Sequence, residues 1–195
     1  MDTGMSIEEL RTLAGNLRKE GLNSQQIADE LSLSQDTIAW LLAGSGGEEK
    51  PLDVSIGWRT IGVRPQRIAA TGAIMADVAA EECGDEIDTV VGISINGVLF
   101  ANEVANQLGC EIAIHRNVDG APGHGSLSNK YGQVSGKRIV IVDDVLSTGV
   151  TMKRTIQAMR EAGAEVLLCM VLVNKTVRNE IEGVPLRGLI RAAVV

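Results

Sequence analysis

The chain has 195 residues, of which 45% are hydrophobic and 22% are charged, so it can bury a core and is not a disordered polymer. Its formal net charge of −7 excludes a protein that coats polyanions by bulk positive charge. Aromatic residues make up only 2% of the chain, which argues against a base-stacking platform for single-stranded nucleic acid.

Helical periodicity in the first 44 residues predicts three short helices. Ser6 and Glu9 have the spacing of a capping box at the start of the first helix. A second helix is expected from about Ser24, and a third is expected from Ser34 to Gly44. Residues 45–51 then combine glycine, serine and charge with a closing proline, which is typical of a flexible linker. We therefore predict two domains, residues 1–44 and residues 52–195.

The segment 21–42 resembles a helix-turn-helix DNA-binding unit. Ala28 is a small residue where two helices would cross, and Ser32 stands at the turn position where glycine is more usual. Residues 1–44 hold three basic and seven acidic residues, so their attraction to DNA phosphates would be weak. The alternative is a three-helix packing or oligomerisation module. The residues expected to face a major groove are Ser34, Gln35, Asp36 and Thr37.

After the linker, short β-branched runs alternate with helical stretches, which predicts an α/β domain with a parallel, helix-covered sheet. Residues 116–137, rich in glycine, serine and asparagine, are expected to form a long functional loop. The other expected elements, in chain order, are a helix at 64–82, a strand at 88–94, a helix at 97–108, strands at 110–115 and 138–144, a helix at 150–162, and strands at 165–173 and 187–194.

The most specific motif spans residues 139–151, where an apolar strand ends in two carboxylates and a hydroxyl- and glycine-containing turn enters a helix. Ligands of open α/β sheets bind beyond the carboxyl ends of the strands, and a helix N-terminus attracts phosphate. The acid pair suits the vicinal hydroxyls of a ribose or a hydrated Mg²⁺. The predicted phosphate- and ribose-binding residues are Asp143, Asp144, Val145, Leu146, Ser147, Thr148, Gly149, Val150 and Thr151. The alternative is an ordinary strand, turn and helix with chance acidic residues.

This motif resembles the phosphoribosyl pyrophosphate signature of type I phosphoribosyltransferases. The resemblance implies their fold, a parallel sheet flanked by helices with a small hood, here near residues 51–67. It also implies a mobile loop at 116–136 that carries Arg116 and Lys130, and phosphoribosyl pyrophosphate or a related phosphorylated ligand. Mg²⁺ would be held indirectly by Asp143 and Asp144, through water or the ligand. The implied pyrophosphate loop is Ser94, Ile95, Asn96 and Gly97, although such glycine-flanked turns are common.

The arrangement most resembles orotate phosphoribosyltransferases, but it departs from them in two ways. No lysine follows Arg116 until Lys130, so residues 117–129 lack the positive charge that would neutralise departing pyrophosphate. Their Lys-Ser-Gly-Arg segment is also absent, and residues 53–59 stand in its place. His115 and His124 are candidate general acids, although a solvated loop histidine is the simpler interpretation. We therefore predict that ligand binding is retained and transfer chemistry reduced, with three candidate catalytic residues, Asp143, Asp144 and Lys130.

The whole layout resembles archaeal orotate phosphoribosyltransferase-like transcription regulators. We predict a homodimeric regulator that binds double-stranded DNA and senses a phosphorylated sugar or nucleotide, which links it to nucleotide metabolism. The alternative is an active phosphoribosyltransferase that uses phosphoribosyl pyrophosphate and Mg²⁺ to modify orotate or another nucleobase. A purely structural module would leave the acid pair and the phosphate turn unexplained.

The three cysteines are far apart and odd in number, so free thiols in a reducing compartment are the simplest interpretation. The longest apolar runs are too short to span a bilayer, and the N-terminus lacks a charged-then-apolar leader. We therefore expect a cytoplasmic protein without a membrane partner.

Overall fold

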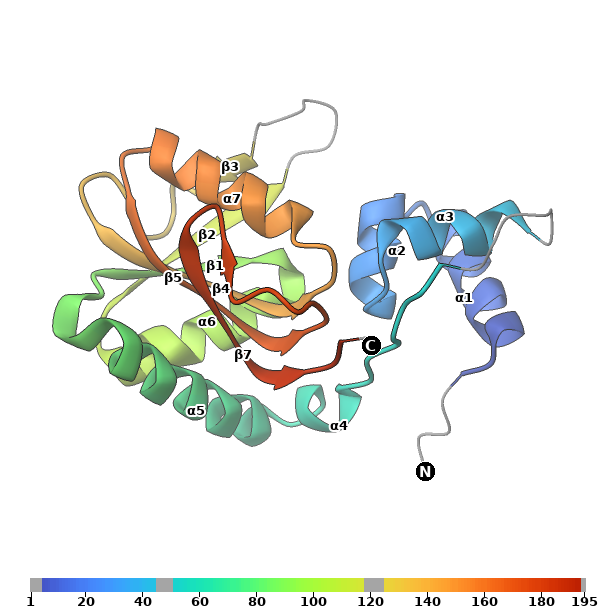
Figure 1. The fold of residues 1–195 in the computed structure, drawn as a ribbon, viewed down its shortest axis with the longest axis horizontal. Coiled ribbons are helices and arrows are strands. Elements are labelled where there is room, and N and C mark those ends of the chain that lie inside the picture. The colour runs from blue at the N-terminus through green and yellow to red at the C-terminus, as the bar shows by residue number, and fades with distance from the viewer. Residues whose placement is uncertain (1–4, 45–50, 118–124, 194–195) are drawn as a thin grey trace.

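The computed structural model describes residues 5–44, 51–117 and 125–193. A small unit of three helices at the N-terminus lies beside a larger α/β domain, as Figure 1 shows. The predicted linker at 45–51 lies outside the described residues except for Pro51, and so does the part of the predicted loop that contains His124. No helix in the described ranges is long and apolar enough to cross a membrane.

The three predicted N-terminal helices are present as α1 (Ile7–Lys19), α2 (Ser24–Leu31) and α3 (Gln35–Ala43). They are held together because each turns an apolar face to a shared core. This core consists of Leu10, Ala14, Ile27, Ala28, Leu31, Leu33, Ile38 and Leu41.

Helix caps follow the sequence pattern closely in this unit. The predicted capping box is confirmed, because Ser6 Oγ accepts a hydrogen bond from the Glu9 amide at 3.2 Å and the Ser6 amide donates to Glu9 Oε2 at 2.7 Å. Ser34 accepts from the Thr37 amide at 3.1 Å and begins α3 as predicted. Ser32 ends α2 with a φ of 50°, in the left-handed region that favours glycine, and this explains the turn between α2 and α3.

The α/β domain is built on a seven-stranded sheet with strand order β3-β2-β1-β4-β5-β7-β6. Its strands are β1 (Thr89–Ile93), β2 (Glu111–Asn117), β3 (Gly125–Leu127), β4 (Arg138–Leu146), β5 (Glu165–Asn174), β6 (Glu180–Ile181) and β7 (Val184–Arg191). The five central strands are parallel, as predicted.

The predicted parallel sheet carries an antiparallel strand at each edge, which the sequence pattern did not indicate: β3 and β6 run antiparallel to their neighbours. Only Glu182 and Gly183 separate β6 from β7, and a two-residue connection can join only antiparallel strands. Both residues have positive φ, as such hairpin turns require. The prediction that residues 116–137 form a loop is wrong in part, because β2 continues to Asn117 and β3 lies inside the segment.

Two layers of helices cover the sheet, with α7 (Val150–Glu161) on one face and α5 (Pro65–Cys83) and α6 (Ser94–Leu108) on the other (Figure 1). Successive side chains of a strand point to opposite faces, so Val90 packs with α5 and α6 while Val91 packs with α7. Two short helical turns, α4 (Arg59–Gly62) and η1 (Gly84–Glu86), complete the domain.

Two boundaries matter for the site. The strand expected to stop at residue 144 continues to Leu146, so both acids of the motif lie within β4. The helix expected from residue 97 begins at Ser94, directly after β1. Because β1 and β4 are parallel neighbours, the start of α6 and the acid pair meet at one edge of the sheet.

Candidate functional site

The acid pair lies buried at the carboxyl end of β4. Asp143 is 8% exposed and Asp144 is 6% exposed. Asp143 Oδ1 accepts hydrogen bonds from Ser94 Oγ at 2.6 Å and from the Asp144 amide at 2.9 Å. Burial raises the pKa of Asp143 well above its usual range, and the neighbouring Asp144 carboxylate raises this pKa further. Burial also raises the pKa of Asp144, so the pair is sensitive to any charge brought beside it.

The predicted pyrophosphate loop packs directly on this pair. Ser94 has a φ of 63°, which is unfavourable for a side-chain-bearing residue, and its Oγ accepts from the Gly97 amide at 2.9 Å. A Cβ at Gly97 would lie 2.7 Å from Asp143 Oδ1 and 2.8 Å from Asp143 Cα. A hydrogen bond from Asn96 opposes the rise in the pKa of Asp144 that burial causes, and Ile95 is 89% exposed. The start of α6 and β4 therefore form one tightly fitted unit.

Residues 147–149 connect β4 to α7 and form the predicted phosphate turn. Gly149 precedes α7 with a φ of 83°, and a Cβ there would lie 3.2 Å from Ile181 Cδ1. Thr148 Oγ1 accepts a hydrogen bond of 3.4 Å from the Val150 amide. The first amides of a helix have no intrahelical acceptor, and the helix dipole makes this end positive. We refer to residues 147–151 as the phosphate loop; its geometry suits a phosphate or another anion.

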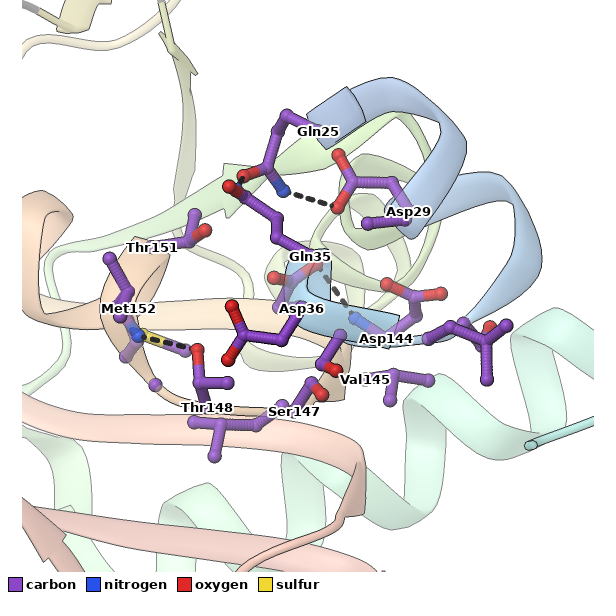
Figure 2. A pocket seen from close by; sticks show the side chains of 18 of the residues that line it. Gln25, Asp29, Gln35, Asp36, Asp144, Val145, Ser147, Thr148, Thr151 and Met152 are labelled. Atoms are coloured by element: carbon purple, nitrogen blue, oxygen red, sulfur yellow. Dashed lines mark hydrogen bonds between the residues drawn. The ribbon is translucent and has the colours of Figure 1, made fainter. Parts of the chain in front are cut away.

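A cavity of about 200 Å³ lies between the phosphate loop and the N-terminal helices. The α/β domain contributes the acid pair, the phosphate loop and Arg154, which is the one cation among the described lining residues. Figure 2 shows the opposite wall, where side chains from α2 and α3 face the phosphate loop. The charged and amide side chains of this helical wall are Gln25, Asp29, Gln35 and Asp36.

The four predicted DNA-reading residues, Ser34 to Thr37, lie at this domain contact in the structure. Gln35 and Asp36 line the cavity, and Gln35 Nε2 donates a hydrogen bond to Gln25 Oε1. Thr37 is only 8% exposed. The structure thus brings together two predicted sites that the sequence places about 110 residues apart, and DNA reading stays a prediction.

A buried polar cluster holds the two domains together. Asp53 Oδ2 accepts hydrogen bonds from the Ser34 amide at 2.8 Å and from Thr37 Oγ1 at 2.7 Å. Lys175 Nζ lies 2.5 Å from Asp53 Oδ1 and donates to the Ser32 carbonyl at 3.0 Å. The Lys175 and Asp53 side chains are 4% and 8% exposed. Burial acts to raise the pKa of Asp53, but the hydrogen bonds from Lys175, Ser34 and Thr37 outweigh it and lower this pKa. We call these residues the Asp53 cluster.

Trp58 connects the predicted hood to the acid pair. Its indole Nε1 donates to Asp144 Oδ2 at 3.2 Å, and its ring centroid lies 5.4 Å from that of Phe100. Sequence reasoning singled out none of Trp58, Asp53, Lys175 or Arg154. Arg154 follows Thr151 by three residues on α7, so helical spacing alone could have placed it on the same face.

The two basic residues of the predicted mobile loop lie away from the cavity. Arg116 is exposed on β2 and Lys130 is exposed after β3, and neither lines the cavity. The interpretation of His115 as a solvated loop residue is wrong, because β2 continues through it and it is 3% exposed. Its Nδ1 lies 3.5 Å from Thr155 Oγ1 on α7, and burial lowers its pKa.

The fit of a magnesium ion depends on the bound ligand. The described residues contain no group of three or more His, Cys, Asp or Glu side chains that could hold a metal. Asp143 also turns one oxygen inward, to Ser94 and its own chain. The protein therefore offers two carboxylates, and phosphate oxygens of a ligand would have to supply further ligands for a bound Mg²⁺.

The fold places the chain in a known class. The profile of the phosphoribosyl transferase domain family matches residues 57–182. Adenine phosphoribosyltransferase from Thermoanaerobacter pseudethanolicus superimposes with a TM-score of 0.59 at 21% identity, over 73% of this chain and 90% of that one. Orotate phosphoribosyltransferase from Aeropyrum pernix gives a TM-score of 0.57 at 21% identity, over 92% and 93% of the two chains. These likenesses show a type I phosphoribosyltransferase fold in the α/β domain.

Relatives of similar length identify the family more closely. The chain is 40% identical to the transcriptional regulator GfcR of Thermoplasma acidophilum over 194 residues, which cover 97% of this chain and 98% of the relative. It is 38% identical to GfcR of Picrophilus torridus, with coverage of 97% and 99%. The chain belongs to the GfcR family of transcriptional regulators, which confirms the predicted resemblance to phosphoribosyltransferase-like regulators.

Proposed function

We propose that the protein is a DNA-binding transcription regulator that senses a phosphorylated sugar or nucleotide through its phosphoribosyltransferase-fold domain. The observation that carries the proposal is the juxtaposition of the phosphate loop with helices α2 and α3 across one cavity. The family supports the regulatory role, since its members bear the name of transcriptional regulators. Ligand and DNA-reading helix would then communicate directly, without a long chain of intermediate contacts.

The chemistry of the cavity defines the ligand class. A phosphate would bind at the start of α7, where free amides, Ser147, Thr148 and the positive end of the helix dipole converge. The Asp143 and Asp144 carboxylates would accept hydrogen bonds from the vicinal hydroxyls of a sugar or hold a ligand-bound Mg²⁺ through water. Phosphoribosyl pyrophosphate has this chemistry and is the probe of choice.

DNA binding would use the helix-turn-helix geometry of α2 and α3. The turn at Ser32 supports that geometry, because its left-handed conformation directs α3 away from α2. The helical unit carries few basic residues, so affinity would require two copies on adjacent half-sites. We therefore propose a homodimer that acts in the cytoplasm, where its free cysteines would stay reduced.

The decisive experiment is a gel-shift titration on the protein's own upstream region, with and without phosphoribosyl pyrophosphate and Mg²⁺. We expect a specific shift whose midpoint changes about five- to tenfold with the ligand. Thr148→Ala removes a hydroxyl from the phosphate loop, so its DNA affinity should no longer respond to the ligand. Thr71→Ala, at a half-buried position of α5 that does not line the cavity, is the matched control and should respond like the wild type.

Two results would contradict the proposal. The first is the absence of a specific shift on any promoter fragment at physiological salt. The second is release of pyrophosphate in the presence of a nucleobase, abolished by Asp144→Asn, which would assign the protein to transferase chemistry instead. Lys130 would then have to enter the cavity from its exposed position after β3.

A further inference from the structure

The helical wall of the cavity is acidic, although it faces a loop built to bind anions. Asp29 of α2 and Asp36 of α3 line the cavity opposite Thr148 and Thr151 (Figure 2). With Asp144 and its neighbour Asp143, they place four carboxylates around one cavity, and Arg154 is the single cation among the lining residues that the structure describes. A phosphate in the closed cavity would therefore meet negative charge from both domains.

The pKa of Asp29 depends in part on the charge of Asp144 in the other domain. The residue is exposed at the cavity mouth, yet surrounding protein reduces the hydration of its carboxyl group. This burial raises the pKa of Asp29 to about 6, and the Asp144 carboxylate adds to the rise while a hydrogen bond from Gln25 opposes it. A doubly charged phosphate beside Asp144 would act on Asp29 in the same direction and more strongly.

Asp36 is the acid of the helical wall that adjoins the phosphate loop in two cavities. It lines two adjoining cavities, and Ser147 and Thr148 line both of them with it. Figure 2 shows its carboxyl group directed toward the phosphate loop. Its carboxyl group forms no hydrogen bond or ion pair with any described residue, and the positive end of the α3 dipole, where it lies, offsets its negative charge only in part. Its charge is therefore available to act on the contents of the cavity.

The contact that keeps the helical wall in place is the Asp53 cluster. Lys175 follows β5 in the α/β domain, and it binds both Asp53 and the carbonyl of Ser32 in the turn between α2 and α3. Asp53 in turn fixes Ser34 and Thr37, which are two of the predicted DNA-reading residues. The closed contact thus withholds these residues from DNA.

We propose that Asp29 and Asp36 exclude an anionic effector while the domains are closed, so that a phosphate on the phosphate loop displaces the helical unit and releases Ser34 to Thr37 for DNA. The inference rests on the proposed function and specifies its direction: the effector strengthens DNA binding. Asp36 is accordingly a specificity-determining residue of the effector site, although it belongs to the DNA-reading helix.

The first test measures ligand affinity by calorimetry with ribose 5-phosphate and with phosphoribosyl pyrophosphate. Asp36→Asn should bind both probes roughly five- to tenfold more tightly than the wild type, because one repulsive charge is removed. Added salt should reduce this gain, since screening weakens repulsion in the wild type. Glu30→Gln removes the same charge from an exposed site on α2 that does not line the cavity, and its affinity should stay unchanged.

Unchanged affinity in Asp36→Asn would overturn the proposal. Weaker affinity would also overturn it, because Asp36 would then accept hydrogen bonds from hydroxyls of the ligand instead of repelling its phosphate.

The second test weakens the Asp53 cluster by a substitution in the α/β domain, so that no predicted DNA-reading residue is changed. Lys175→Met leaves Asp53 buried without its cation, which favours separation of the domains. In gel shifts without ligand, this variant should bind DNA about tenfold more tightly than the wild type and match the ligand-saturated wild type. Lys137→Met loses a surface ion pair with Glu111 and should behave like the wild type.

Asp53→Asn provides a second route to the open state, and thermal unfolding checks that both variants retain the α/β domain. Wild-type DNA affinity in both folded variants, or a ligand that weakens DNA binding, would overturn the inference while leaving the proposed function standing. If the wild type and every variant failed to bind DNA and phosphate ligands, both the inference and the proposed function would be overturned.

Discussion

The wall that the α/β domain gives to the cavity presents backbone amides and hydroxyls at the start of α7, whereas the wall given by α2 and α3 presents carboxylates and amides. The first wall is the proposed binding surface, and its parts are neighbours in sequence, from β4 through the turn into α7. The second wall is assembled by a contact between domains and is held by the Asp53 cluster. The difference teaches that the phosphate loop is built from neighbours in the chain, whereas the wall that faces it depends on a contact between domains, which we propose to be reversible.

The largest expected effect on stability and ligand binding comes from disturbing the fit between α6 and β4, which supports the acid pair. Gly97→Ala would place a methyl group 2.7 Å from Asp143 Oδ1 and 2.8 Å from Asp143 Cα, so α6 and β4 must separate. We expect a loss of about 1–3 kcal/mol in the free energy of unfolding and a loss of ligand binding. Urea denaturation and calorimetry measure the two effects.

Gly15→Ala is the control for this change, because no atom lies within 4 Å of the position where its Cβ would be. It lies in α1 and should gain about 0.5–1 kcal/mol. Equal behaviour of the two variants would show that the fit between α6 and β4 is unimportant.

The next prediction compares two glycine substitutions, in order to distinguish a loss of ligand binding at the phosphate loop from a loss of stability. Gly149→Val imposes a β-branched side chain on a φ of 83° and approaches Ile181. Gly183→Val imposes similar backbone strain, at a φ of 74°, where nothing lies within 4 Å. Both should lose about 1–2 kcal/mol of stability, but only Gly149→Val should lose affinity for phosphoribosyl pyrophosphate, by more than about tenfold. Retained affinity in Gly149→Val would move the ligand away from this loop.

A smaller effect is expected at the link between the hood and the acid pair. Trp58→Phe keeps an aromatic ring against Phe100 but removes the donor to Asp144. Loss of one hydrogen bond to a buried carboxylate should cost about 1 kcal/mol of stability and shift ligand affinity severalfold. Trp40→Phe, in the helical unit, serves as the control for ligand affinity in the same titrations. Identical ligand affinities in the two variants would mean that the hydrogen bond from Trp58 to Asp144 does not affect ligand binding by the acid pair.

The smallest effect is a pH dependence of the helical wall. The pKa of Asp29 is about 6 in the folded protein, above the usual value near 4, so the folded state binds more protons between these values. Stability should therefore fall as pH rises from about 4 to about 6 and then level off. Asp29→Asn should show a shallower fall in the thermal midpoint over this window, with the remaining slope due to Asp143 and Asp144, whose pKa values are also raised.

Glu30→Gln should keep the wild-type slope in this experiment. A slope in Asp29→Asn as steep as in the wild type would contradict the assignment of the fall to Asp29.

Sequence reasoning succeeded where neighbours in the chain decide the structure. The capping box at Ser6, the left-handed turn at Ser32 and the strand, acid pair and helix of residues 139–151 depend on local spacing. It failed at the antiparallel edges of the sheet and at the burial of His115, because edge pairing and the packing of β2 against α7 depend on distant residues. Hydrophobic periodicity does not specify such pairing.

The amino-acid order by itself determined a turn between a buried strand and a helix, which we predict to bind phosphate, and a three-helix unit ahead of it, since caps, glycines and apolar periods act over a few residues. Only the tertiary structure decided that these two parts share one cavity. That arrangement depends on Asp53 and Lys175, which lie about 120 residues apart and meet only because β5 ends beside the turn between α2 and α3. Because both side chains are buried, the loss of either one would leave an uncompensated charge, and this burial exists only in the folded chain.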